Sequence, residues 1–439
     1  MQVDTAGVRD WRELISRKVG LIRSISPQVR APNEPQPPYL STATVSNFDF
    51  RNVAKQDRLA AGKGRTEAES QEAAVGEAVE RYCAAHWDTH RTVVAKWEEV
   101  RKSAIAPSEF VLYSERQYAM PGWPHPRWTP EMEVTWVPGV VLPQEREVAL
   151  PASLIYLISP PPRIEEMFVP ATSNGLAAGP DLPSAVYSGL CELMERDALL
   201  IAWMNRLPAI EIEVDHSGVY TPAIARHYRK FGVELRAFRM PYDLPVSVVM
   251  AIGFDSHPEK PAAVVGMGCH SDPSVALDKA VFEMCQGRPS ESRLFIDRPP
   301  AERLRKYDDV KELEDHAAYL TIRENLHEFE FLWSTGKKAR TRDLPNPSAD
   351  TAERNLAICV AALAERGHRF AYIDLTTSDL QAYPYRVVRT VATGLQPIHF
   401  GWGEERLGGD RLFDLPHELG FAAARRTEAD LNPCPHPLA

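Results

Sequence analysis

Two short segments of this 439-residue chain carry the same charged residues at the same spacing. Residues 76–83 read GEAVERYC and residues 191–198 read CELMERDA, which aligns Glu77, Glu80 and Arg81 with Glu192, Glu195 and Arg196. Carboxylates are the ligands that hard divalent cations prefer. An arginine guanidinium group can form two parallel hydrogen bonds to the oxygens of one phosphate. The repeated pattern therefore indicates a site for a metal ion and a nucleotide.

Each segment is predicted to be helical, because only a helix gathers these side chains on one face. Residues three or four positions apart share a helix face, so Ser188, Glu192, Glu195 and Arg196 form one stripe. The rest of residues 184–199 is apolar, as in a core helix. Buried carboxylates are costly unless cations or strong donors meet them. A structural ion pair with an arginine is the alternative, and the second occurrence of the pattern favours the metal-nucleotide interpretation.

Small residues precede both helices. The first helix is predicted to begin at Thr66, with Glu69 three residues on as in a capping box, and to extend to about Trp87. A flexible glycine turn, residues 62–64, leads into it, and the segment ATSNGLAAGP at residues 171–180 leads into the second helix. Small side chains at these places allow a ligand to approach the backbone.

A third helix is predicted from Pro273 to Gln286. Asp272 caps it, and the residues Gly287 and Pro289 are expected to stop it. Glu283 and Gln286 then lie one turn apart on the same face. Residues 30–38 are too rich in proline for a helix or strand and are predicted to be a loop. Strands are expected at residues 39–50, within 210–254, at 262–268, and in the runs RFAYIDL and YRVVRTVA near the C-terminus.

Composition excludes several classes of protein. Lys plus Arg total 50 against 60 for Asp plus Glu, a net charge of −10 without a basic run, which argues against nucleic-acid binding. No apolar run is long enough to span a membrane, and the N-terminus is too polar for a secretory signal, so we expect a cytoplasmic protein without membrane contact. The six cysteines are scattered without a CxxC pair and are predicted to be buried thiols.

Taken in order, the motifs resemble the YcaO-domain family, and more narrowly the cyclodehydratase subunits that make azoline heterocycles in ribosomally made peptides. The resemblance runs from about Gly62 to the C-terminus. It rests on GKG and ExxER at residues 62–81, SNG at 173–175, SxxxExxER at 188–196, ExxQ at 283–286, an arginine-bearing strand before a glycine turn at 389–394, and a terminal PxPxP at 433–437. The order and spacing of these motifs, and above all the proline tail, carry the match.

The resemblance implies an α+β fold of YcaO type, with mixed and antiparallel sheets flanked by helices and with two equivalent ExxER helices around an ATP site. It implies a single YcaO domain: an N-terminal extension and linker (1–60), a nucleotide-binding core (61–290), a peripheral helical layer (291–350) and a C-terminal part with the tail (351–439). Mg²⁺ would be held by Glu77, Glu80, Glu192 and Glu195. The nucleotide ATP would be contacted by Lys63, Arg81, Asn174, Ser188, Arg196, Glu283, Gln286 and Arg389.

The activity implied is an amide activation. A Cys, Ser or Thr side chain of a precursor peptide attacks the preceding carbonyl, ATP phosphorylates the resulting oxyanion, and loss of phosphate leaves a thiazoline or oxazoline. Prolines at Pro433, Pro435 and Pro437 would hold the tail extended and place the terminal carboxylate of Ala439 near the reacting amide as a proton acceptor. A disordered end is the general alternative for such a terminus.

The resemblance also implies partners: a ribosomal precursor peptide, a separate leader-binding protein of the ubiquitin-activating type and a flavin dehydrogenase, with a homodimer among the assemblies it allows. Relatives that make thioamides or amidines usually lack the PxPxP tail. A non-catalytic subunit that binds the leader peptide would have eroded acidic motifs, and here they are intact. An unrelated ATP-dependent ligase is a further alternative, and the sequence has no GxxxxGK[ST] motif for a P-loop enzyme.

Overall fold

The computed structural model describes residues 9–46, 59–85, 89–157 and 164–438. The chain divides into two compact units, which are described separately. Unit 1 comprises Met1–Gln28, Tyr39–Leu193 and Thr351–Thr393, and unit 2 comprises Val29–Pro38, Met194–Asp350 and Gly394–Ala439. Among the described helices, none is long and apolar enough to cross a membrane.

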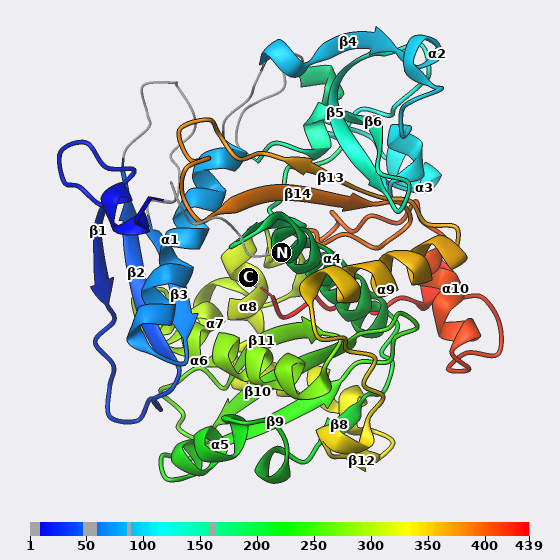
Figure 1. The fold of residues 1–439 in the computed structure, drawn as a ribbon. Helices are drawn as coiled ribbons and strands as arrows, with labels where there is room; N and C mark the ends of the chain where they lie inside the picture. Colours follow the sequence, from blue (N-terminus) through cyan, green and yellow to red (C-terminus); the bar gives the residue numbers. More distant parts are fainter. Residues whose placement is uncertain (1–8, 47–58, 86–88, 158–163, 439) are drawn as a thin grey trace. The chain divides into compact units, whose positions relative to one another are not determined.

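Antiparallel sheets make up most of unit 1 (Figure 1). Its strands are β1 (Ile22–Pro27), β2 (Tyr39–Val45), β3 (Leu59–Gly64), β4 (Val93–Lys96), β5 (Glu133–Leu142), β6 (Arg146–Pro151), β7 (Leu176–Gly179), β13 (Phe370–Asp374) and β14 (Arg386–Ala392). One sheet has the order β1-β2-β3 and another the order β4-β5-β13-β14-β7, with β6 paired to β5. Its helices are α1 (Glu67–Ala84), α2 (Trp97–Val100), α3 (Glu115–Tyr118) and α9 (Ala352–Glu365).

Helix α1 packs against both sheets, and its sequence explains how. Thr66 caps its start by accepting the backbone N–H of Glu69 at 3.2 Å, as the sequence predicts. Its buried face consists largely of small residues, which allow strand β3 to approach closely. A Cβ atom on Gly62 would lie 2.0 Å from the carbonyl oxygen of Ser70, so only glycine fits there. The expected glycine turn at residues 62–64 is therefore wrong: these residues belong to β3, and their glycines serve close packing.

Unit 2 is built on a mixed sheet covered by helices. Its strands are β8 (Ile210–Ile212), β9 (Val233–Arg239), β10 (Ser247–Asp255), β11 (Ala263–His270) and β12 (Lys338–Ala339), in the order β11-β10-β9-β8-β12. Its helices are α5 (Thr221–Arg229), α6 (Pro273–Asp297), α7 (Pro300–Arg303), α8 (Leu313–Leu320) and α10 (Arg411–Glu418). The apolar side chains of α5 and α6 share one core with the sheet, in which α6 lies mainly against β10 and β11 and α5 against β9 (Figure 1).

Helix α4 (Leu182–Met204) carries residues of both units, since unit 1 ends at Leu193 within it. Its long apolar surface agrees with the predicted core helix. Strand β12 pairs with β8 in parallel and the other described pairs are antiparallel, which confirms the expected α+β class with mixed and antiparallel sheets. All six cysteine side chains are buried, as predicted.

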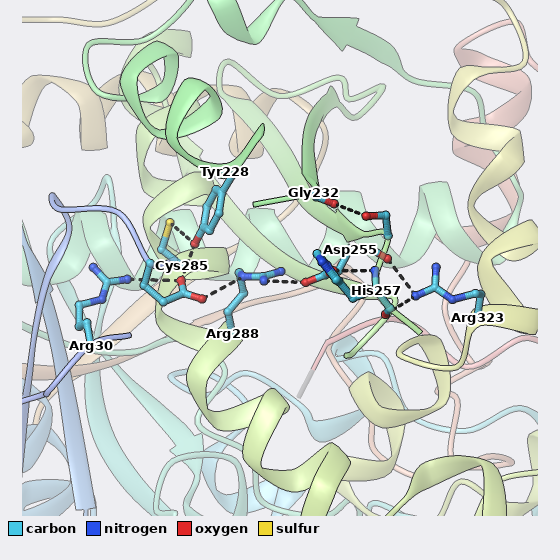
Figure 2. A network of polar contacts seen from close by, with 10 residues as sticks. Arg30, Tyr228, Gly232, Asp255, His257, Cys285, Arg288 and Arg323 are labelled. Atoms are coloured by element: carbon cyan, nitrogen blue, oxygen red, sulfur yellow. Dashed lines mark hydrogen bonds and ion pairs between the residues drawn. The ribbon is translucent and has the colours of Figure 1, made fainter. Parts of the chain in front are cut away.

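Helix α6 does not stop where the sequence suggests. It continues through Gly287 and Pro289 to Asp297. Arg288, between these two residues, is buried and forms ion pairs with Asp255 at 3.0 Å and Glu34 at 3.3 Å (Figure 2). These tertiary contacts hold the backbone in place and outweigh the local preference of glycine and proline to end a helix. Residues 291–297, expected in a peripheral layer, therefore belong to α6.

Candidate functional site

In unit 1, the first carboxylate pair lies on α1 beside strand β3. Glu77 accepts the backbone N–H of Ala61 at 2.8 Å and one N–H of the Arg81 guanidinium at 2.5 Å. Arg81 also donates to the carbonyl of Leu59 at 3.1 Å. Each of these groups is partly exposed, with 30% of the Arg81 side chain and 29% of the Glu77 side chain accessible. The pair is thus anchored to β3 and still reachable by a ligand.

Glu80 is the most perturbed acid of this group. It accepts the backbone N–H of Ala178 in β7 at 3.0 Å. Burial raises the pKa of Glu80 well above its ordinary value, and the negative charges of Glu192 and Glu77 raise it further. The carboxylates of Glu77 and Glu192 are thus close enough for their charges to act on Glu80. Such a cluster favours a cation or protonation of one member.

The segment before β7 presents Asn174 and lies against β14. Gly175 has a positive φ of 86°, and a Cβ there would lie 2.5 Å from the carbonyl oxygen of Thr390, so the turn requires glycine. The Oδ1 atom of Asn174 is buried and meets no hydrogen-bond partner in the described parts of the chain. Arg389, also buried, donates to the carbonyl of Thr172 at 2.7 Å. These contacts hold the backbone of residues 172–175 against β14, the strand that carries Arg389.

In unit 2, Glu195 and Arg196 pair with each other on α4. Their closest N–O distance is 3.2 Å, and only 17% of the Arg196 side chain and 10% of that of Glu195 are exposed. The next residue, Asp197, is fully buried and accepts from Tyr242 at 2.9 Å and from Arg411 at 2.8 Å. This network holds the helix segment that carries the pair, and sequence reasoning missed it because Asp197 has no repeated counterpart.

Glu283 and Gln286 lie on α6, one turn apart as predicted, and both are partly buried. The polar network of Figure 2 includes Cys285 and Arg288 of the same helix. In it, Tyr228 donates to Glu34 at 2.8 Å, and the Cys285 sulfur lies 3.3 Å from the same hydroxyl oxygen. Arg288 bridges Glu34 to Asp255. Burial raises the pKa of Tyr228 well above its usual value, so the phenol remains a donor. The network fixes the part of α6 on which Glu283 and Gln286 stand.

The C-terminal residues are ordered and buried, in contrast to the alternative of a disordered end. Residues 434–438 are buried, and Pro433 is exposed. Cys434 accepts the indole N–H of Trp203 at 2.9 Å through its carbonyl. Arg196 lies near enough to His436 for its charge to lower the pKa of that imidazole, which burial already depresses. The predicted residue Ala439 lies outside the described residues.

The remaining predicted residues are placed as follows. Lys63 is a partly buried residue of β3, and Ser188 is exposed on α4. The structure brings Glu77, Glu80, Arg81 and Glu192 together in unit 1, and Glu195, Arg196 and the tail in unit 2. Within the described ranges, no group of three His, Cys, Asp or Glu side chains is arranged to hold a metal ion by itself. Mg²⁺ commonly takes one or two carboxylates and completes its shell with phosphate oxygens and water.

A cavity of about 400 Å³ lies in unit 2 away from the predicted residues. It is lined by the end of α6, by α7 and by α8, and it contains Glu291 and Glu314. Burial raises the pKa of Glu291 to about 7, with a contribution from the charge of Glu314. Sequence reasoning assigned no chemistry to this region, and none of the predicted site residues lines the cavity.

Comparison with known proteins relates the chain to heterocycle-forming enzymes and to proteins of unassigned activity. An uncharacterized protein of Methanothermobacter thermautotrophicus is 29% identical over 356 residues, which cover 79% of this chain and 84% of that protein. A heterocyclase solved in complex with substrate and cofactor superposes with a TM-score of 0.81 at 26% identity over 98% of this chain, and this chain covers 56% of it. It therefore spans little more than half of that enzyme.

A second solved structure is a YcaO protein of Methanopyrus kandleri bound with AMPPCP and Mg²⁺. It has a TM-score of 0.63 at 22% identity and covers 88% of each chain, which shows a common fold. The model of the family described as YcaO cyclodehydratase, ATP- and Mg²⁺-binding, matches residues 61–396. The motifs on α1, α4, α6 and β14 all fall within that range. The chain therefore belongs to the YcaO cyclodehydratase family, whose cofactors are ATP and Mg²⁺.

Proposed function

We propose that this chain is an ATP-dependent cyclodehydratase that converts Cys, Ser or Thr residues of a ribosomal precursor peptide to thiazoline or oxazoline. The main support is the cluster of Glu77, Glu80 and Glu192, because three carboxylates that repel one another suit a cation. The ordered proline tail is the second support, since it favours azoline formation over the thioamide- and amidine-forming relatives that usually lack it.

The residues fit ATP and Mg²⁺. The acidic ligands proposed for Mg²⁺ are Glu77, Glu80, Glu192 and Glu195, and a bound ion would offset the repulsion that raises the pKa of Glu80. The buried Oδ1 of Asn174 offers an acceptor for a ligand donor such as a ribose hydroxyl. The other proposed nucleotide contacts are Lys63, Arg81, Ser188, Arg196, Glu283, Gln286 and Arg389. When bound, Mg²⁺ supplies charge neutralisation for phosphoryl transfer.

The chain's own arginine side chains are held in place before any ligand binds. Arg81 is held by Glu77 and the carbonyl of Leu59, and Arg389 by the carbonyl of Thr172. Guanidinium groups fixed in this way meet a developing charge without having to reorient. The amide oxygen of a peptide is a poor leaving group, and phosphorylation makes it a good one. The residues therefore need to bind, orient and neutralise rather than attack the amide themselves.

The tail is proposed to supply the proton acceptor. Pro433, Pro435 and Pro437 limit the tail to extended backbone, which lowers the ordering cost of placing its end. The carboxylate of Ala439 would then accept a proton from the reacting amide or side chain. We further propose a separate leader-binding protein of the ubiquitin-activating type, a flavin dehydrogenase and a homodimer as partners, on the strength of the family resemblance.

The test uses mass spectrometry and a phosphate assay together. The chain is incubated with Mg²⁺, ATP, a leader-bearing precursor peptide rich in Cys and Ser, and the leader-binding partner. We expect one water lost and one phosphate released for each ring, and little processing without the partner, because the partner concentrates the substrate. Incorporation of sulfur into the peptide in a parallel incubation with added sulfide would indicate a thioamide enzyme instead. Binding of the peptide without any ATP turnover would indicate a non-catalytic subunit.

A further inference from the structure

Aromatic ring N–H groups hold the C-terminal tail, defined here as residues 432–438. Prolines have no backbone N–H, so a tail with proline at every second position cannot pair as a strand and offers mainly its carbonyls. Three of those carbonyls are met by ring donors. Trp402 donates to Pro433 at 3.2 Å, Trp203 donates to Cys434 at 2.9 Å, and the ring of His316 contacts the carbonyl of His436 at 3.2 Å.

The last of these donors, His316, is hydrogen-bonded to the backbone of His436 in the tail. The Nε2 atom of His316, on helix α8, accepts the backbone N–H of Gly401 at 2.8 Å, so its Nδ1 carries the proton that is donated to His436. The ring of His436 donates from Nε2 to the carbonyl of His399 at 2.7 Å and accepts the backbone N–H of Leu438 at 3.3 Å. These partners assign one neutral tautomer to each ring.

The two rings also stack. Their centroids are 4.0 Å apart with 20° between the planes, and the His399 ring meets His436 edge-on at 4.9 Å. All three histidines are buried. The hydrogen bond from the backbone N–H of Leu438 to the His436 ring holds the last described residue of the tail in place. The end of the chain is thus fixed by its own histidine, and that histidine is fixed by α8.

We propose that His316 and His436 are positioning residues that hold residues 432–438 of the tail in the arrangement that cyclodehydration requires. This proposal rests on the proposed function of the tail. It assigns a role to the non-proline residue between Pro435 and Pro437, and to a residue of helix α8 that is 120 positions away in the sequence. Neither histidine touches the reacting atoms in this account.

The test measures how accessible the tail is to a carboxypeptidase, separately from the reaction. Four variants are compared with the wild type: His316→Ala, His316→Asn, which keeps a donor near the Nδ1 position, His436→Ala, and His270→Asn as a matched control. His270 is a half-buried histidine of β11 whose pKa burial also lowers to about 4, and its ring accepts the backbone N–H of Asp272 at 2.9 Å. Carboxypeptidase Y then digests each native protein, and mass spectrometry follows the release of Ala439 and Leu438.

We expect roughly tenfold faster release from His316→Ala and His436→Ala, a smaller increase from His316→Asn, and the wild-type rate from His270→Asn. Equal release rates in all five proteins would overturn the proposal. If His316→Ala does not fold, His436→Ala removes the same stack from the side of the tail. The digestion needs no peptide substrate, so it decides whether the histidines hold the tail even if the proposed function fails.

A second experiment measures ring formation by the same variants on a synthetic leader-bearing peptide that contains a single Cys. The turnover number for water loss should fall in the three tail-directed variants, while calorimetric affinity for ATP stays within about threefold and His270→Asn behaves as wild type. Partial recovery in His316→Asn would separate positioning from general destabilisation. Faster release of the tail with unchanged turnover, in a wild type that forms rings, would overturn the positioning role. A wild type that forms no rings would contradict the proposed function instead.

Discussion

The imidazole of His316 lies 4.0 Å from that of His436, with 20° between the ring planes, and donates to the carbonyl of the residue it stacks on. This one contact connects helix α8 to the end of the chain. Both rings act as donor on one nitrogen and acceptor on the other, so both are neutral. Protonation of either ring would turn an acceptor into a donor and break a bond that now holds the tail.

Stability should therefore depend on pH through His316. Burial lowers its pKa from 6.5 to about 4, and the hydrogen bond to the carbonyl of His436 and the charge of Asp315 oppose that shift only in part. Between these values the unfolded chain binds the proton and the folded chain does not, so the stabilisation is complete above about pH 6.5 and is lost as the pH falls toward 4. Burial is the main cause that lowers the pKa of His436 and of His399, and the charges of Arg196 and Arg406 act in the same direction.

Urea midpoints measured near neutral pH and near pH 5 check this expectation. The wild type should lose stability over that range, and His316→Asn should lose less of it because one titrating group is gone. Identical pH dependence in the two proteins would show that His316 titrates normally.

Glu80→Gln should separate a cofactor ligand from a structural ion pair. The substitution keeps the volume and an acceptor for the N–H of Ala178, and it removes one of three repelling charges. ATP turnover should fall by roughly tenfold or more, while the melting temperature of the nucleotide-free protein stays level or rises. The control is Glu72→Gln, an exposed glutamate on the same helix, which should change neither quantity. Lower stability with unchanged turnover per folded molecule would favour the ion pair.

Extension of the chain by a few residues after Ala439 should stop ring formation and leave nucleotide binding intact. The added residues move the terminal carboxylate without removing the buried Leu438. Calorimetric titration with ATP and counting of water losses per peptide measure the two quantities separately. The same residues added at the N-terminus serve as the control. Equal loss of both quantities would mean that the tail only maintains the fold.

Arg288→Met should destabilise unit 2 by about 3–5 kcal/mol, because it leaves the carboxylates of Glu34 and Asp255 without their buried partner (Figure 2). Arg293→Met, at an exposed position of the same helix, should stay within about 0.5 kcal/mol of the wild type. Chemical denaturation measures both. Similar effects for the two variants would argue against a role of the network in holding α6.

The carboxylate helices could be predicted from the sequence because their signals are local, and the α+β class followed from the family resemblance. Thr66 and Glu69 mark the start of α1, and the spacing of Glu192 and Glu195 marks one face of α4. The family expectation, with ATP and Mg²⁺, is confirmed by the match over residues 61–396. The individual ligands remain predictions, because their assignment depends on a nucleotide and an ion rather than on the fold.

Features set by distant contacts could not be predicted. The local sequence predicts a turn at Gly62, because it does not show that helix α1 packs closely against this residue. Helix α6 continues past Pro289 because Arg288 is held by Asp255 and Glu34, residues far away in the sequence. The bond between His316 and His436 spans 120 positions and leaves no periodic signal. In each case the deciding interaction is tertiary.

The most direct measurement follows the oxygen of the peptide amide. A precursor peptide is synthesised with a heavy oxygen isotope in the carbonyl that precedes a single Cys, and it is incubated with the chain, its leader-binding partner, Mg²⁺ and ATP. If the amide oxygen is phosphorylated and leaves with phosphate, the label appears in inorganic phosphate, one equivalent for each ring formed. Label found in water, or rings formed without phosphate release, would contradict the account.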